Sequence, residues 1–530
     1  MDVLSGLTSL LTISTVVLLI VGACLGLVIG ALPGLGPVFV LTILLPITIH
    51  FSTINALVML VAAYTAAVYG GAITAVVFNV PGHPGNIATT FDGPAMARQG
   101  RAGEAVVAIA VAGVVGGLVA TAVFVFVAPV ITNLALKLQP VDFFMLAVFG
   151  LSMVAAASGR RVVPGLVLGG VGLLISTIGP DVMTGKYRFT FGVGFLQQNG
   201  IPLALVAVGL FAFGSAFLMI EEGWRASPRE QGTVTLKGGI KRGLRAAIEH
   251  PIEILRSGVL GTVIGIIPGL GITLSNIAAY LMESRFKRSA EWGKGYVVGV
   301  MAPEAADSAT LISELIPAFT LGIPGAATSA LMLEALMLHG VTAGPGFFNG
   351  GKTVNAFFLS IPLAMVVVAL LGLMLAPVVV RMAQIPTKIV APAIIVIASV
   401  GAYVVNGSVF DIVLAMIFGV VGYAILKLRL PLAPLIMGTL LGPLAEENFD
   451  RVRILDQTTH SVAFFQPLAL VLAAISLTVF TTPLLGTMLR SRRPSSTPTS
   501  HSGTVEGAGE DAETSALIAS VSSQTGTDGL

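Results

Sequence analysis

The sequence has 530 residues, of which 55% are hydrophobic and only 10% are charged, and its formal net charge is +2. Soluble globular domains carry about 25% charged residues, so this composition excludes an ordinary water-soluble enzyme or binding protein. The small net charge gives no indication of a nucleic-acid partner.

Three long stretches contain no Asp, Glu, Lys or Arg: residues 3–91, 105–136 and 353–380. Each is longer than the ~20 apolar residues that cross a bilayer as a helix. Lipid offers the backbone no hydrogen-bond partner, so these stretches must be helical, whereas a transmembrane β-barrel needs short alternating segments. We therefore predict an all-α polytopic membrane protein with about 11–13 transmembrane helices.

A helix-breaking phrase occurs twice. Residues 26–36 read GLVIGALPGLG and residues 261–271 read GTVIGIIPGLG, with eight of the eleven positions identical. A second Pro-Gly segment follows each copy, at residues 79–90 and 322–333. Proline removes a backbone N–H and glycine lets the chain bend, so we predict two internal repeats with Pro-Gly broken helices or hairpins at the membrane midplane. The uncharged N-terminus and the basic central segment favour inverted repeats.

The charge pattern divides the chain into four parts. Residues 1–222 are the first membrane repeat, 223–255 a cytoplasmic basic loop, 256–490 the second membrane repeat, and 491–530 a disordered tail. The loop is assigned to the cytoplasm because basic residues accumulate on that side. The tail has no aromatic residue and cannot bury a core.

The broken segments are the candidate substrate site. A half-helix N-terminus presents N–H groups and a partial positive charge, which suits an anion, and neutral amide and hydroxyl donors can also hold a carboxylate. The candidate substrate-binding residues are Gly34, Asn79, Gly82, Asn86, Thr89, Thr90, Gly269, Gly325, Thr328 and Ser329. The alternative is that each Pro-Gly pair is only a kink that permits close helix packing.

Acidic residues without basic neighbours are the candidate ion-coupling site. Residues 295–351 contain no Lys or Arg but include Glu304, Asp307, Glu314 and Glu334. Spacings of three and seven place the first three on one helical face. Buried acids without basic partners need protons or cations, so this pattern predicts coupling to Na⁺ or H⁺. The alternative is that some acids lie in exposed loops or at helix starts, as Pro303-Glu304 suggests.

Asp92 is the first charged residue after Asp2. An acid within a membrane helix is costly and is a functional candidate by default, so Asp92 joins Glu304, Asp307 and Glu314 as a candidate ion-coupling residue. The alternative is a surface turn at Asp92-Gly93-Pro94. Catalytic motifs and Cys/His metal spacings are missing from the sequence, so we predict no enzyme, no catalytic residue and no cofactor.

Several long motifs carry a resemblance to one family. They include PGLGP, GVMAPEAADSA, FTLGIPGAATSALMLEAL and FGVVGYAILKLRLPLAPLIMGTLLGPLAEEN. Over about residues 10–490 the chain resembles the large membrane subunit of the bacterial tripartite tricarboxylate transporters. This resemblance implies a multi-pass protein of the bacterial cytoplasmic membrane that works with a small membrane subunit and a periplasmic or extracellular solute-binding protein. It also implies uptake of citrate-like organic carboxylates, driven by an ion gradient.

The family's motifs fall on particular positions of this chain. Its Pro-Gly pairs match Pro33-Gly34, Pro81-Gly82, Pro268-Gly269 and Pro324-Gly325, its Asp-Gly matches Asp92-Gly93, and its Pro-Glu-Ala-Ala matches Pro303–Ala306. Two positions depart from the family pattern: Asp307-Ser308 stands where Asn-Asn is frequent, and Pro94-Ala95-Met96 where Tyr-Pro-Met is frequent. Substrate and coupling ion can therefore differ. The alternatives are a stand-alone secondary transporter or ion exchanger and, more remotely, an intramembrane enzyme.

Overall fold

The computed structural model describes residues 3–32, 34–156, 161–181, 184–222, 238–287, 289–341, 344–459 and 466–491. It divides into one unit of residues Met1–Leu484 and a second of residues Leu485–Leu530. Pro33, residues 223–237 of the predicted basic loop, and the predicted tail from residue 492 onward lie outside the described residues.

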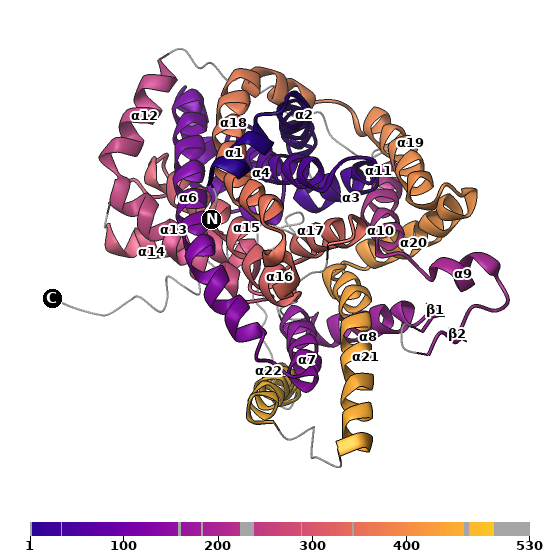
Figure 1. The fold of residues 1–530 in the computed structure, drawn as a ribbon. Helices are drawn as coiled ribbons and strands as arrows, with labels where there is room; N and C mark the ends of the chain where they lie inside the picture. Colours follow the sequence, from indigo (N-terminus) through magenta and orange to yellow (C-terminus); the bar gives the residue numbers. More distant parts are fainter. Residues whose placement is uncertain are drawn as a thin grey trace, which may run out of the picture. The chain divides into compact units, whose positions relative to one another are not determined.

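Helices make up almost all of the described chain, which confirms the predicted all-α class (Figure 1). Those before residue 223 are α1 (Val3–Leu10), α2 (Ile13–Gly30), α3 (Gly36–Thr48), α4 (Thr53–Phe78), η1 (Pro84–Asn86), α5 (Thr89–Arg98), α6 (Ala102–Ala135), α7 (Pro140–Ala156), α8 (Val162–Ser176), α9 (Gly194–Asn199), α10 (Leu203–Ala207), η3 (Val208–Phe213) and α11 (Gly214–Glu222). Those after residue 237 are α12 (Gly239–Glu249), α13 (Pro251–Ile266), α14 (Gly271–Phe286), α15 (Val298–Ser313), α16 (Leu315–Leu321), α17 (Ala327–Leu338), η4 (Gly344–Asn349), α18 (Lys352–Met382), α19 (Thr387–Asn406), α20 (Val409–Lys427), α21 (Ala433–Thr459) and α22 (Pro467–Ser491). Strands β1 (Gly179–Pro180) and β2 (Tyr187–Arg188) form a small antiparallel ribbon between α8 and α9.

The described residues contain seven helices long and apolar enough to cross a membrane, and five shorter apolar helices of 10–17 residues. One of the seven, Leu203–Glu221, runs continuously through α10, η3 and α11. The structure is therefore that of a multi-pass helical membrane protein, in agreement with the prediction.

Helix α4 lies at the centre of the fold. Its apolar window is fully buried, and it packs against α2, α3, α5, α6 and α18. The helix begins after Ser52, whose hydroxyl accepts the backbone N–H of Asn55, and ends at Asn79 in a left-handed conformation. These are ordinary start and stop signals for a helix. They set the position of the first Pro-Gly break that follows α4.

The repeated phrase packs α2 against α4 through glycine. A Cβ atom added at Gly26 or Gly30 would lie 2.3 or 2.1 Å from the carbonyl oxygens of Ala63 and Ala67. No side chain fits at such distances, so the two backbones approach this closely only because glycine occupies both positions.

The second copy of the phrase packs α13 against α15 in the same way. A Cβ atom at Gly261 would lie 2.2 Å from the carbonyl oxygen of Ala306, and one at Gly265 would lie 2.7 Å from that of Thr310. The matching glycines of the two phrases therefore have matching packing roles. Close helix packing, the alternative raised from the sequence, accounts for this part of the repetition, while the inverted orientation of the two repeats stays a prediction.

The described part of the predicted cytoplasmic basic loop at residues 223–255 is helical, because Gly239–Glu249 forms helix α12 and α13 begins at Pro251. The cytoplasmic side of this segment stays a prediction. Helix α12 packs on α6 through a face of small residues, and a Cβ atom at Gly239 would lie 2.6 Å from the backbone of Gly103. Reading the segment by charge alone concealed this face, whose members recur at helical spacing.

Candidate transport site

In each half of the sequence, a backbone hydrogen bond joins the two Pro-Gly breaks. The N–H of Gly34 donates to the carbonyl oxygen of Gly82 over 3.2 Å, and that of Gly269 donates to Gly325 over 2.9 Å. Gly34 and Gly269 have φ angles of +83° and +86°, where a side chain would strain the backbone. Both N–H groups are thus already bonded to the protein, although the sequence made them candidates for binding an anion.

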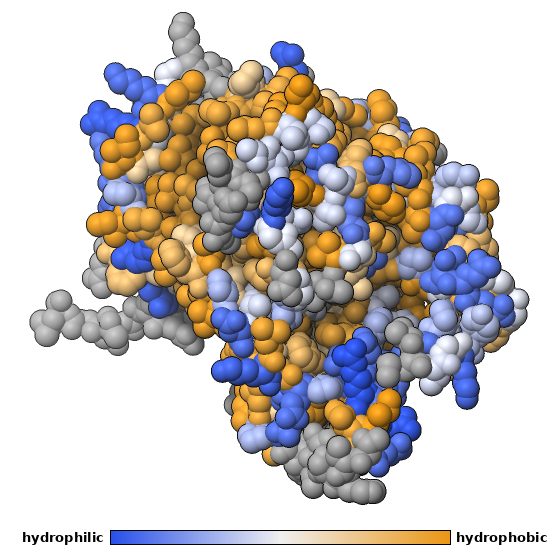
Figure 2. Space-filling view, viewed as in Figure 1, coloured by the Kyte–Doolittle hydropathy of each residue, from blue (hydrophilic) through white to orange (hydrophobic). Residues whose placement is uncertain are grey.

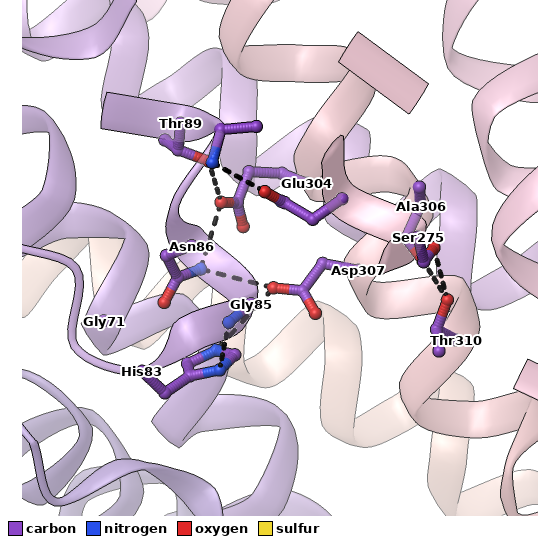
Figure 3. Close-up of polar contacts among 12 residues, drawn as sticks. Gly71, His83, Gly85, Asn86, Thr89, Ser275, Glu304, Ala306, Asp307 and Thr310 are labelled. Atoms are coloured by element: carbon purple, nitrogen blue, oxygen red, sulfur yellow. Dashed lines mark hydrogen bonds and ion pairs between the residues drawn. The ribbon is translucent and has the colours of Figure 1, made fainter. Parts of the chain in front are cut away.

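Two buried acids of α15 face the Pro-Gly segment at residues 79–90, which we call the first break from here on (Figure 3). Asn86 donates through Nδ2 to Glu304 over 3.1 Å and to Asp307 over 3.3 Å, and the Thr89 hydroxyl donates to the same Glu304 oxygen. Glu304 is 2% exposed and Asp307 is fully buried. Asn86 and Thr89, predicted to bind substrate, thus bond to the predicted ion-coupling acids, and the structure unites the two sets.

His83 completes this cluster, and its hydrogen bonds define its tautomer. Its Nδ1 accepts the backbone N–H of Gly85 over 3.0 Å, so Nδ1 carries no proton and the neutral ring carries its proton on Nε2. Nε2 lies 3.7 Å from Oδ2 of Asp307. The ring therefore directs an N–H toward the carboxylate without reaching hydrogen-bond distance (Figure 3).

Four buried polar atoms around the first break lack a hydrogen-bond partner within the described part of the chain. Two are oxygens, Oδ1 of Asn86 and Oδ1 of Asp307, and two are nitrogens, Nδ2 of Asn276 and Nε2 of His83. Unpaired buried polar groups cost about 1–3 kcal/mol each, so they call for an explanation. Oxygens suit a cation, and N–H groups suit a carboxylate.

A small cavity of about 30 Å³ reaches Glu304 from the side of α4, α6 and α18. Its polar lining comes from Thr65, Tyr69, Glu304 and Ser308. A cavity needs about 10–15 Å³ on this measure to hold one water molecule. The space therefore suits a water molecule or a dehydrated cation, and it is too small for an organic acid.

Glu314 forms a second acidic centre at the end of α15. It is 2% exposed, and its Oε1 accepts hydrogen bonds from the hydroxyls of Tyr64 on α4 and Thr328 on α17. Thr328 lies in the Pro-Gly segment at residues 322–333, in the later half of the sequence, whereas Tyr64 belongs to the earlier half. The two parts of the chain therefore meet at this carboxylate.

Asp92 has a different environment from the other candidate acids. It accepts hydrogen bonds from the Tyr280 hydroxyl over 2.9 Å and from the backbone N–H groups of Gly295 and Tyr296 over 2.8 and 2.9 Å. The alternative surface turn is wrong, because Asp92 is fully buried inside α5. The two backbone donors fix the segment before α15 against α5, and Tyr280 ties α14 to the same carboxylate.

The alternative helix start at Pro303-Glu304 is also wrong, because both residues lie in the interior of α15. Glu334, 8% exposed on α17, shares no hydrogen bond with these acids among the described residues.

The remaining predicted substrate residues do not converge with the acids. Asn79 is exposed at the end of α4, the Thr90 hydroxyl bonds to the carbonyl of Ile87, and Ser329 caps α17 by accepting the N–H of Ala326. These side chains bond to nearby backbone groups at helix ends. The sequence pattern alone does not distinguish such residues from ligand-binding ones.

Three residues of this site were not among the predicted site residues: Tyr64, His83 and Asn276. Asn276 is fully buried on α14, and its Oδ1 accepts the backbone N–H of Ala88 from the first break over 2.8 Å. The sequence does contain a signal for Tyr64 and Asn276, because a single phenol or amide within an apolar segment needs a hydrogen-bond partner inside the membrane.

A larger cavity of about 580 Å³ lies beside the Pro-Gly segment at residues 322–333. Leu321 and Gly322 line it together with Asn448 and Arg451 of α21. This volume falls within the range of small-molecule sites.

Residues 16–437 match the model of the tripartite tricarboxylate transporter TctA family. The chain is 35% identical over 500 residues to a 52.8 kDa protein in the TAR-I ttuC′ 3′ region of Agrobacterium vitis, covering 93% of this chain and 98% of the relative. A protein in the TAR-II ttuC′ 3′ region of the same organism is 33% identical over 235 residues, covering 44% of this chain and 97% of that relative. No solved structure matches the chain.

The family match extends across both pairs of breaks and all the acids of α15. The family is one of transporters and not of enzymes, which agrees with the prediction of no catalytic site. By its sequence and its helical architecture, the chain belongs to the tripartite tricarboxylate transporter TctA family.

Proposed function

We propose that this chain is the membrane permease subunit of a three-component secondary transporter in the bacterial cytoplasmic membrane. It takes up tricarboxylates or related organic carboxylates, using a Na⁺ or H⁺ gradient. A small membrane subunit and a periplasmic or extracellular solute-binding protein complete the system. Membership of a tripartite transporter family and the multi-pass helical fold support this proposal.

The observation that carries the proposal is the incompletely paired acid cluster at the first break. Glu304 and Asp307 are buried, and no Lys or Arg of the described chain pairs with either. Oδ1 of Asp307 and Oδ1 of Asn86 remain without partners there. A Na⁺ ion would be coordinated by such oxygens, and a proton would neutralise the same charge. Either cation offsets the free-energy cost of burying these carboxylates without a partner of opposite charge.

Coupling follows from the unpaired donors beside the acids. Nδ2 of Asn276 and Nε2 of His83 can each donate to a substrate carboxylate, but two bare carboxylates nearby repel an anion. A cation bound at Glu304 and Asp307 cancels this repulsion, so cation and substrate each raise the affinity for the other. Such mutual dependence is the thermodynamic requirement for symport.

The test is uptake of labelled citrate into proteoliposomes that contain both membrane subunits, with the solute-binding protein added outside. We expect accumulation under an inward Na⁺ or H⁺ gradient and none when both gradients are collapsed. Uptake that requires ATP and ignores both gradients would refute the mechanism. Full uptake by vesicles containing this chain alone would instead establish a stand-alone transporter.

A further inference from the structure

Three aromatic side chains stand exposed around the β1–β2 ribbon. Tyr187 and Phe189 are each 61% exposed and Phe191 is 88% exposed; we call these three residues the aromatic patch. Phe189 and Phe191 have φ angles of +52° and +50°, a left-handed conformation that bulky residues rarely adopt. Strain of this kind persists where the surroundings enforce it and is concentrated at functional sites.

The aromatic patch is held on a fixed support. Arg188, which lies between Tyr187 and Phe189, donates two hydrogen bonds to Glu446 on α21, the one from Nη2 measuring 2.9 Å, and lies 3.3 Å from Asp181. The carboxylates of Asp181, Glu446 and Asp450 approach within 4.8 Å of one another. Arg188 and Arg453, which pairs with Asp450 over 3.5 Å, supply two positive charges to these three acids, so the ribbon is anchored to α21 in a cluster of mixed charge.

Chain topology assigns the patch to the outer side of the membrane. It lies between two apolar helical segments, α8 and Leu203–Glu221. Their far ends both adjoin basic positions: Arg161 precedes α8 and donates to the carbonyl of Leu428 over 2.6 Å, and the basic central segment follows α11. Basic residues mark the cytoplasmic side. If each of the two segments crosses the membrane once from that side, the ribbon between them lies on the extracytoplasmic side.

The surroundings of the patch are polar and not lipid-like. Figure 2 shows hydrophilic and intermediate residues over the region of α9 and the ribbon, at the right of the view, while apolar residues dominate over the upper membrane helices. Lys186, the sequence neighbour of Tyr187, is exposed, and so is Gln198 on α9. Exposed aromatic anchors within a polar rim are characteristic of protein docking sites.

From these observations we propose that the aromatic patch is the docking point for the soluble solute-binding protein on the outer face of the transporter. This inference rests on the proposed function, because it requires an extracytoplasmic partner. The partner's docking face would offer apolar pockets to Phe189 and Phe191, surrounded by polar side chains that match the mixed charges at the base of the ribbon. The rigid anchor lowers the entropy lost on binding.

The first experiment measures the affinity of the solute-binding protein for the two-subunit membrane complex in nanodiscs. The double substitution Phe189→Ala/Phe191→Ala should weaken binding by about tenfold or more, as expected for hot-spot aromatics. The maximal uptake rate at saturating binding protein should stay near the wild-type value. The control is Phe126→Ala, which removes a phenylalanine 77% exposed on the membrane helix α6 and should leave the affinity unchanged.

A second measurement does not depend on the stability of the double variant. Cys24 is the only cysteine, so a Cys24→Ser/Phe191→Cys variant carries one label site at the patch. A membrane-impermeant maleimide should label it from outside right-side-out vesicles, and the binding protein should slow this labelling about tenfold or more.

Several results would overturn the proposal. Labelling only from the inside would place the patch on the wrong side of the membrane. Uptake that depends on the binding protein, combined with unprotected labelling at position 191 or unchanged affinity of the double variant, would refute the docking point and leave the proposed function intact. Weaker reconstitution or altered oligomeric state without a change in affinity would assign the patch to lipid or to a second copy. Uptake independent of any binding protein would refute the proposed function itself.

Discussion

Asn86 lies against Asp307, 221 residues further along the chain, and its amide nitrogen donates to that carboxylate over 3.3 Å. The contact joins the first break to α15, in the later half of the sequence. Within the described chain, each of the two side chains still has one oxygen without a partner. The pair therefore contributes acceptors that a cation can use, and its geometry should respond to whether the cation is present.

Asp307→Asn should uncouple transport from the driving ion. The substitution keeps the size of the side chain and removes its charge, so the cation loses a principal ligand or the proton loses its acceptor. Stimulation of citrate uptake by the gradient should fall to about onefold, because the cation no longer raises the affinity for citrate, an effect of roughly 5–150-fold between coupled sites. The measurement is initial uptake in proteoliposomes with and without an imposed gradient.

The matched control is Asp411→Asn. Asp411 is also fully buried, but it accepts hydrogen bonds from Asn406 and Ser408 at the start of α20. This variant should retain gradient-stimulated uptake even where its stability is reduced. If both variants lost stimulation equally, burial of any carboxylate would explain the effect and Asp307 would have no special role.

Much of the fold could be predicted because it follows from solvent physics. Charge-free stretches such as residues 105–136 must be helical in lipid, and α6 covers nearly the same residues. The repeated phrase likewise marks equivalent positions, and Gly30 and Gly265 make equivalent close helix contacts. These features depend on local sequence, so the sequence alone reveals them.

The site was only partly predictable, because long-range pairing decides it. The sequence indicated Glu304 and Asp307 as acids without basic partners, but not that Asn86 bonds to both. It also grouped Asp92 with them, although three donors from other segments satisfy Asp92. Which polar group meets which carboxylate depends on contacts about 200 residues apart, and no local pattern encodes them.

Asp92→Asn should therefore affect stability more than coupling. Hydrogen bonds to a charged acceptor are worth about 1.5–3 kcal/mol and those to a neutral one about 0.5–1.5 kcal/mol. Weakening the two bonds from Gly295 and Tyr296 should therefore cost about 2–3 kcal/mol of stability. The thermal midpoint of the purified protein should fall, while the folded fraction keeps gradient-stimulated uptake. Loss of stimulation at an unchanged midpoint would return Asp92 to the ion-coupling set.

Gly82→Ala should disturb the first break. A Cβ atom there would lie 2.3 Å from Cα of Gly71 and 2.4 Å from the carbonyl oxygen of Gly30. Neither backbone can yield without shifting a helix, so the cost should be about 1–3 kcal/mol, with a marked loss of uptake. Gly170→Ala is the control, because nothing lies within 4 Å of its added Cβ atom on α8. Equal behaviour of the two variants in uptake and thermal stability would contradict the close approach at Gly82.

Asn276→Asp should act on substrate affinity. Asn276 is fully buried; its Oδ1 accepts the N–H of Ala88, and its Nδ2 has no partner among the described residues. Aspartate keeps the acceptor but replaces the N–H₂ group with a negatively charged oxygen. A substrate carboxylate would lose a donor and meet a like charge, which should raise the apparent KM for citrate about tenfold or more.

The comparison for this prediction is Asn55→Asp, which changes a half-buried amide at the start of α4 whose Oδ1 accepts the hydroxyl of Thr15 over 2.7 Å. Its KM for citrate should remain within about twofold of the wild type, since surface or remote changes leave substrate contacts intact. The apparent affinity for the driving ion separates two accounts of Asn276→Asp. A substrate role predicts a raised KM while Na⁺ or H⁺ still stimulates uptake, because Glu304 and Asp307 are unchanged. If the new carboxylate strengthened cation binding and left the KM for citrate unaltered, Asn276 would belong to the cation centre, and the unpaired donor would not mark the substrate.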